Sequence, residues 1–185
     1  MAGEGVFIID ANVLIDYIEV DASVLTLIAD HLGPVNVPRR ILQELKRQRL
    51  EDTDCDALGL TIVTEEYSEL VEAAGMKGPL SFQDHLMLIL AKGRGWTAIT
   101  NDGGLRKALE REKVPKKWGL EMMLELVGAE RLASDRAIGL AERIVEANPR
   151  YAAAVLAEFK KKVAALKRSQ FRSTPRKSKR PPNLG

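Results

Sequence analysis

Short apolar runs alternate with longer amphipathic stretches over the first two thirds of the chain. The runs at residues 6–9, 35–37, 60–63 and 97–101 have the length and composition of strands that are buried on both faces of a parallel sheet. The stretches around them predict helices over residues 12–17, 22–32, 65–74, 81–93, 105–112 and 118–126, and another that starts at residue 38. Residues 50–59 predict a helix or a loop, and residues 113–115 a last edge strand. Strands that alternate with helices favour βαβ units, so we expect an α/β fold with a mainly parallel sheet.

The pattern changes after residue 128. Residues 134–146 and 151–168 predict two helices separated by Asn148-Pro149, and the second carries apolar residues spaced by four at Tyr151, Val155, Phe159 and Val163. A helical hairpin of this kind must bury its apolar stripe against the body or a partner. From residue 169 the chain is dominated by Ser, Arg, Lys and Pro, which predicts disorder. We therefore divide the chain into a domain at 1–128, a helical extension at 129–168 and a basic tail at 169–185.

The net charge of +2 conceals a strong asymmetry. Residues 1–159 contain 18 Lys and Arg against all 26 acidic residues, a balance of −8, whereas residues 160–185 contain 10 Lys and Arg and no acid. A basic segment of this kind commonly binds nucleic acid or another polyanion. The alternatives are that it only improves solubility, or that it folds back on the acidic body.

The cysteine and histidine content limits which disulfides and metal sites the chain can form, and so bears on its compartment. Cys55 is the one cysteine, so no intramolecular disulfide forms, and His31 and His85 are the only histidines, too few for a zinc cluster. We interpret His85 as structural or surface-exposed. The sequence starts without a secretory signal pattern and contains no run as long as a membrane span. We therefore expect a soluble, cytoplasmic protein with no membrane partner.

Four acidic residues stand at or beside the ends of predicted elements. Asp10 and Asp102 follow apolar strands, while Glu44 and Asp84 lie on predicted helices. Ligands of open α/β sheets bind at the carboxyl ends of the strands, so Asp10 and Asp102 are expected to share a crevice. Carboxylates gathered in one crevice repel one another unless a cation lies among them, which favours a Mg²⁺ or Mn²⁺ site for phosphate chemistry. Each acid also has a simpler interpretation as a helix cap or part of a solvated helix face.

The order of these acids and their surroundings resembles the PIN-domain nucleases, including the VapC-type toxins. The resemblance covers residues 6 to about 127 and depends on four segments, Ile8-Ile9-Asp10-Ala11-Asn12, Val37-Pro38 followed by Glu44, Asp84 at the start of an apolar helix, and Thr100-Asn101-Asp102. It implies a three-layer α/β/α domain in which the four acids hold one or two divalent metals and hydrolyse RNA. It also implies that Asn12 and Thr100 orient a ligand or water.

Partners and substrate contacts follow partly from the resemblance and partly from charge. The resemblance implies RNA as substrate, a homodimer, and a protein antitoxin as partner. The basic tail favours a ribonucleoprotein partner as the alternative. The hairpin departs from a minimal toxin, which leaves a processing nuclease as the other interpretation. Cations that surround Glu44 are candidates for gripping the RNA backbone, namely Arg39, Arg40, Lys46 and Arg47, with Arg106 and Lys107 as a second group. For both groups, ordinary solvated helix surface is the alternative.

Two further points concern the site. Asp16 is a weaker candidate, since it lies well beyond Asp10 along the same predicted helix, and no aromatic platform for stacking bases is evident in the sequence. A non-catalytic RNA- or ribosome-binding protein on a PIN-like fold is the alternative function.

Overall fold

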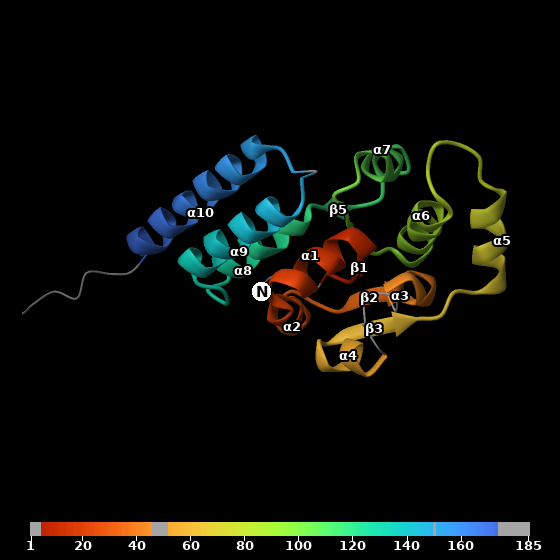
Figure 1. Cartoon of the computed structure of the whole chain (residues 1–185), viewed down its shortest axis with the longest axis horizontal. Helices are drawn as coiled ribbons and strands as arrows, with labels where there is room; N and C mark the ends of the chain where they lie inside the picture. The colour runs from red at the N-terminus through yellow and green to blue at the C-terminus, as the bar shows by residue number, and fades with distance from the viewer. Residues whose placement is uncertain (1–4, 46–51, 150, 174–185) are drawn as a thin grey trace, which may run out of the picture.

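The computed structural model describes residues 5–45, 52–149 and 151–173, and within them the chain forms an α/β fold around one sheet (Figure 1). Its five strands are β1 (Phe7–Ile9), β2 (Val35–Pro38), β3 (Leu60–Val63), β4 (Thr97–Ile99) and β5 (Lys116–Lys117). They lie in the order β3-β2-β1-β4-β5, and every pairing is parallel. The expectation of an α/β fold with a parallel sheet is therefore confirmed.

Strand residues alternate between two cores on opposite faces of the sheet. Phe7 and Ile9 of β1 enter a large core, whereas Ile8 between them enters a small core. In β4, Ala98 and Ile99 divide in the same way. Successive side chains of a strand point to opposite faces, so both faces of the sheet need a covering layer of helices. This burial of both faces explains why the strand sequences are continuously apolar.

The large core is covered by helices from both ends of the chain. These helices are α1 (Ala11–Asp21), α2 (Ser23–His31), α3 (Arg39–Leu45), α4 (Asp52–Ala57), α8 (Gly119–Gly128), α9 (Ser134–Ala147) and α10 (Ala153–Ser173). On the other face, the small core lies beneath α5 (Tyr67–Gly75), α6 (Phe82–Arg94) and α7 (Gly103–Arg111). The described helices and the sheet thus form three layers.

The C-terminal hairpin packs on the domain. In Figure 1, α9 and α10 lie side by side and cover α8, at the end of the molecule opposite α5. Phe159 and Val163 of α10 are buried in the large core together with residues of α1, α8 and α9. The first half of the predicted stripe behaves differently, because Val155 is 40% exposed and Tyr151 is half-buried. The hairpin therefore shares the core of the domain through only part of its apolar stripe.

The prediction of the last edge strand is wrong in its position. Residues 113–115 were expected to form the edge strand, but Lys113 has a left-handed φ of 57° and Val114 donates to the carbonyl of Leu109 at 2.8 Å. These residues close the C-terminal end of α7. Strand β5 begins only at Lys116, and its two lysines are typical of an edge strand.

Other boundaries differ less. Pro38 ends β2 instead of starting a helix, so α3 begins at Arg39. Helix α10 continues to Ser173, so the predicted tail begins inside a helix, and residues 174–185 lie outside the described part. No helix among the described residues is long and apolar enough to cross a membrane.

Candidate functional site

The carboxyl ends of β1 and β4 lie at the topological switch point of the sheet, where the strand order reverses. The chain passes from β1 to β2 on one side, and β4 pairs with β1 on the other. Helix α1, which follows β1, packs on the large core, whereas α7, which follows β4, borders the small core. Because the two helices leave toward opposite faces, the crevice between these strand ends is the usual ligand position in such folds. Asp10 and residues 100–102 stand in this crevice.

Asp10 is the most buried acid at this point. Its side chain is only 8% exposed, and its Oδ2 accepts a hydrogen bond of 2.9 Å from the Thr100 hydroxyl. Burial raises the pKa of Asp10, and the negative charges of Asp84 and Asp102 raise it further, against the lowering effect of Thr100 and the backbone N–H of Asn12. Asp84 and Asp102 thus both lie near enough to Asp10 to disfavour its charge, as expected for a site that attracts a cation.

Thr100 connects Asp10 with Asp102. It is fully buried, and its Oγ1 both donates to Asp10 and accepts from the backbone N–H of Asp102 at 3.1 Å. Asp102 caps α7, where its Oδ1 accepts from the N–H of Leu105 at 2.7 Å. Thr100 therefore holds the carboxylate of Asp10 and the backbone of Asp102 together at the strand end.

Asp84 is held by the first turn of α6. Its Oδ2 accepts from the backbone N–H of Ser81 at 3.0 Å and from the Ser81 hydroxyl at 2.8 Å, while Ser81 caps the helix in return. The capping alternative is thus correct for Asp84 and for Asp102. Capping leaves room for a ligand, because Oδ1 of Asp84 and Oδ2 of Asp102 accept no hydrogen bond from the residues that the structure describes.

The donor set suits Mg²⁺ or Mn²⁺ in its chemistry. Among the described side chains, no three acidic, histidine or cysteine groups lie close enough together to enclose an ion. Mg²⁺ does not need such a cage, since it retains several waters and is bound through one or two carboxylates together with substrate phosphate. The raised pKa of Asp10 between two like charges fits a cation at this position. Glu44 lies on α3, and its side chain is outside the described part.

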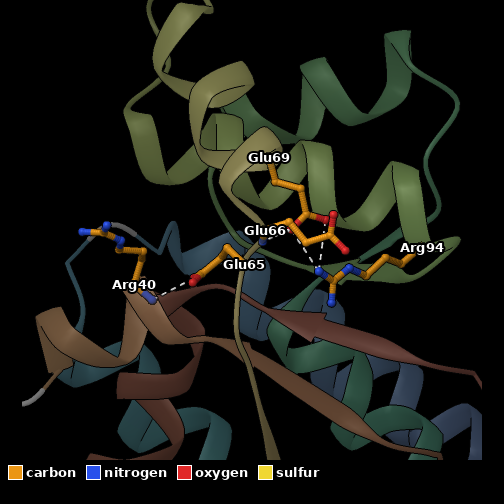
Figure 2. Close-up of polar contacts among 5 residues, drawn as sticks. All are labelled: Arg40, Glu65, Glu66, Glu69 and Arg94. Atoms are coloured by element: carbon orange, nitrogen blue, oxygen red, sulfur yellow. Dashed lines mark hydrogen bonds and ion pairs between the residues drawn. The ribbon is translucent and has the colours of Figure 1, made fainter.

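The structure describes two of the four cations around Glu44 that were predicted to bind the RNA backbone. Arg40 is exposed at the start of α3, where its backbone N–H donates to Glu65 Oε1 at 2.8 Å. Figure 2 shows its guanidinium pointing away from this glutamate, while Glu69 binds Arg94 of α6 through both carboxylate oxygens at 3.0 Å. Glu65 therefore anchors the helix that carries Glu44. Arg39 is half-buried, and Lys46 and Arg47 lie outside the described residues.

A polar network joins the hairpin to the strand end beside the acids. The hydroxyl of Tyr151 donates to Asp16 Oδ2 at 2.9 Å and accepts from the side-chain amide of Asn101. The amide of Asn148 donates to Asp16 Oδ1 at 3.0 Å. Asp16, which the sequence suggested only weakly as a site residue, is thus the attachment point of the hairpin on α1. Its partners lie 132 and 135 residues away, beyond the reach of local pattern.

The network continues into α8. Asn101 Oδ1 accepts from the N–H of Gly119 at 2.9 Å, and the Gly119 carbonyl accepts from the hydroxyl of the buried Tyr17 at 2.5 Å. A Cβ on Gly119 would lie 2.9 Å from Val13 Cγ1, so this close approach requires glycine. Asn101, the residue beside Asp102, is therefore held by α8 through Gly119 and by the segment before α10 through Tyr151.

The two tyrosines of this network are expected to resist ionisation. Burial, and then the charge of Asp16, raises the pKa of both Tyr17 and Tyr151. A phenol whose pKa is raised by folding stabilises the protein fully below the unfolded value near 10, and this contribution is lost as the pH rises further. The variant Tyr67→Phe removes the exposed third tyrosine. In an alkaline titration of this variant followed by tyrosinate absorbance, we expect neither Tyr17 nor Tyr151 to ionise before the protein unfolds. Tyrosinate absorbance from the folded variant would contradict the network.

Two features of this region were not evident from the sequence. Trp118 directly follows β5 and is 48% exposed, and the guanidinium of Arg106 lies 3.6 Å from the centroid of one of its rings. Arg106 also donates to the Thr100 carbonyl at 3.0 Å, and burial lowers its pKa. Arg106 is therefore fixed against the Thr100 carbonyl and the Trp118 ring instead of lying on open helix surface. His85 is buried, as the structural interpretation requires.

Comparisons with known proteins add no assignment. A scan against protein-family models finds no match to this chain, and no curated protein matches its sequence.

Proposed function

We propose that the chain is a divalent-metal-dependent endoribonuclease of the PIN type. The observation that carries this proposal is Asp10, a buried acid whose pKa is raised by burial and by two further carboxylates at the switch point of a parallel sheet. Folding does not gain from such a cluster, because like charges that lose solvent destabilise the folded state. Clusters of this kind are found where a cation and its substrate supply the missing charge.

The proposed ligands are Asp10, Asp84 and Asp102, with Glu44 as the fourth acid of the resemblance. A bound Mg²⁺ or Mn²⁺ would neutralise charge on the scissile phosphate and lower the pKa of an attacking water. The chain supplies the rest. Thr100 orients Asp10, the helix caps orient Asp84 and Asp102, and Arg106 of α7 is fixed to the end of β4 by its hydrogen bond to the Thr100 carbonyl. No protein nucleophile is required.

RNA is the proposed substrate because of the resemblance. Whether the enzyme is a VapC-like toxin held by an antitoxin or a processing nuclease depends on what contacts the hairpin, which packs on the core and is tied to Asn101. A non-catalytic RNA-binding protein on this fold is the competing function, and it predicts binding without turnover.

The test is a cleavage assay on single-stranded and structured RNAs, with a matching DNA, in Mg²⁺, Mn²⁺ or EDTA. The informative variant is Asp102→Asn, because Asn caps a helix about as well as Asp while the charge is removed. We expect cleavage to fall by about tenfold to a hundredfold or more, as for loss of a group that supports or binds a metal, with the melting temperature and RNA affinity in EDTA retained. Equal cleavage by this variant would contradict the role proposed for Asp102. No cleavage by a folded wild type that binds RNA would favour the non-catalytic function.

A further inference from the structure

A groove extends from Asp102 to α10. Its volume is about 980 Å³, and its walls come from the strand end at 101–103, the beginning of α8 and the first turns of α10. This size lies at the upper end of the roughly 300–1,000 Å³ found for small-molecule sites. Asp102 and Gly103 belong to its lining, so the groove is continuous with the proposed metal site. A bound nucleic acid would therefore contact both the proposed metal site and the groove.

Trp118 gives the groove an aromatic surface. Its side chain is 48% exposed although it sits between two secondary elements, and the guanidinium of Arg106 lies 3.6 Å from the centroid of one of its rings. The hydrogen bond from Arg106 to the Thr100 carbonyl keeps this stack in place. An exposed aromatic ring with a stacked guanidinium is a platform on which a nucleobase of any kind can lie.

The charged residues of the groove favour a nucleobase with one neighbouring phosphate over a row of phosphates. Lys162 of α10 lies 4.0 Å from Glu158, and Lys116 lies 3.6 Å from Glu110, so both lysines have only loose partners. Surface pairs at such distances contribute little stability, and either lysine can turn to a phosphate at small cost. Glu121 and Glu158 also line the groove, which disfavours a row of phosphates along it.

We propose that this groove holds the base of an unpaired nucleotide of the substrate, stacked on Trp118, with Lys162 contacting a neighbouring phosphate. The inference rests on the proposed nuclease function and adds that the substrate must be single-stranded next to the cleaved bond. Val155, 40% exposed on the groove wall, supplies an apolar contact for the base. Continuity with Asp102 favours a nucleotide over a peptide segment, because the phosphate at the metal site fixes where the next base must lie.

Binding in EDTA tests the groove without requiring cleavage. The probes are labelled oligouridylate and oligoadenylate of about ten nucleotides, a length within the roughly 4–16 nucleotides that single-strand sites occupy, together with a duplex of the same length. We expect Trp118→Ala to weaken binding of the single strands about 5- to 150-fold, as loss of one stacked base implies, and to leave duplex affinity unchanged. Trp118→Phe keeps a ring and should retain most of the affinity while losing the quenching of Trp118 fluorescence that we expect in wild type.

Two adjacent lysines of α10 provide a matched control. Lys162 lines the groove, whereas Lys161 is exposed and is not part of the lining. The variants Lys162→Ala and Lys161→Ala remove the same charge from the same helix. If Lys162 contacts phosphate, its loss should reduce the slope of log affinity against log salt by about one, and Lys161→Ala should leave the slope as it is.

The outcomes separate the two proposals. Equal affinity of wild type and Trp118→Ala for single strands would overturn the groove proposal even if wild type cuts RNA with metal. A folded wild type in which no oligonucleotide quenches Trp118 would also overturn it and leave the groove to a protein segment. Loss of affinity in Trp118→Ala and Lys162→Ala but not in Lys161→Ala supports it. Cleavage by wild type with metal is read separately and tests the nuclease function itself.

Discussion

Replacing Asp10 by asparagine is expected to abolish cleavage and, in the same protein, to increase stability. The amide oxygen of asparagine can still accept from the Thr100 hydroxyl, so the local geometry is preserved. The charge that burial and two neighbouring carboxylates disfavour is removed. We expect cleavage to fall at least about a hundredfold and the free energy of unfolding without metal to rise by about 0.5–2 kcal/mol, the usual gain of a stabilising substitution.

The measurement pairs a cleavage assay with thermal or urea unfolding in EDTA. Asp30→Asn is the control, because Asp30 is an exposed acid at the end of α2 and its loss changes the net charge by the same amount. Surface substitutions of this kind usually change stability by less than about 0.5 kcal/mol. A variant that is destabilised in EDTA would show that the charge of Asp10 serves the fold, and the metal site would then lose its main support.

Truncating Phe159 is expected to produce the largest loss of stability. Its ring is 3% exposed and packs in the large core, where α10 meets α8 and α9. Removal of a buried aromatic ring usually costs about 3–5 kcal/mol, because apolar contacts are lost and a cavity remains. Phe159→Ala should therefore lower the urea midpoint strongly, and Val155→Ala, four residues earlier and 40% exposed, should change it little.

The form of the transition is as informative as its midpoint. If the hairpin and the domain share one core, Phe159→Ala should shift a single cooperative transition with little change in slope. A separate early transition for α9 and α10, with the main transition unmoved, would show that residues 129–168 form an independent unit.

The sequence was most informative where chemistry is local. The strands could be predicted because buried parallel strands are apolar on both faces, and Asp10 and Asp102 could be brought together because parallel strands end at one edge. The caps at Asp84 and Asp102 were also open to local analysis, since both interactions span three residues. These features need no knowledge of the folded whole.

The rest depends on contacts between distant parts of the chain. Tyr151 looked like the first member of an apolar stripe, but its hydroxyl binds Asp16 and Asn101 across the fold. Trp118 had no local feature to mark it as exposed, and its stack with Arg106 arises only when β5 is laid beside β4. Residues 113–115 were misplaced because the end of α7 and an edge strand have similar composition.

The length of α10 fixes the distance between the groove and the end of the helix at Ser173. The helix begins at the groove, where Ala154 and Val155 lie in the wall, and continues for 21 residues to Ser173. At about 1.5 Å per residue it spans roughly 30 Å. Residues 174–185 are attached that far from the first turn of the helix, and their basic sequence predicts polyanion binding. Under the proposed function, a substrate long enough to reach both ends would gain a second contact that a short oligonucleotide does not have. Affinity should therefore rise in a step with substrate length.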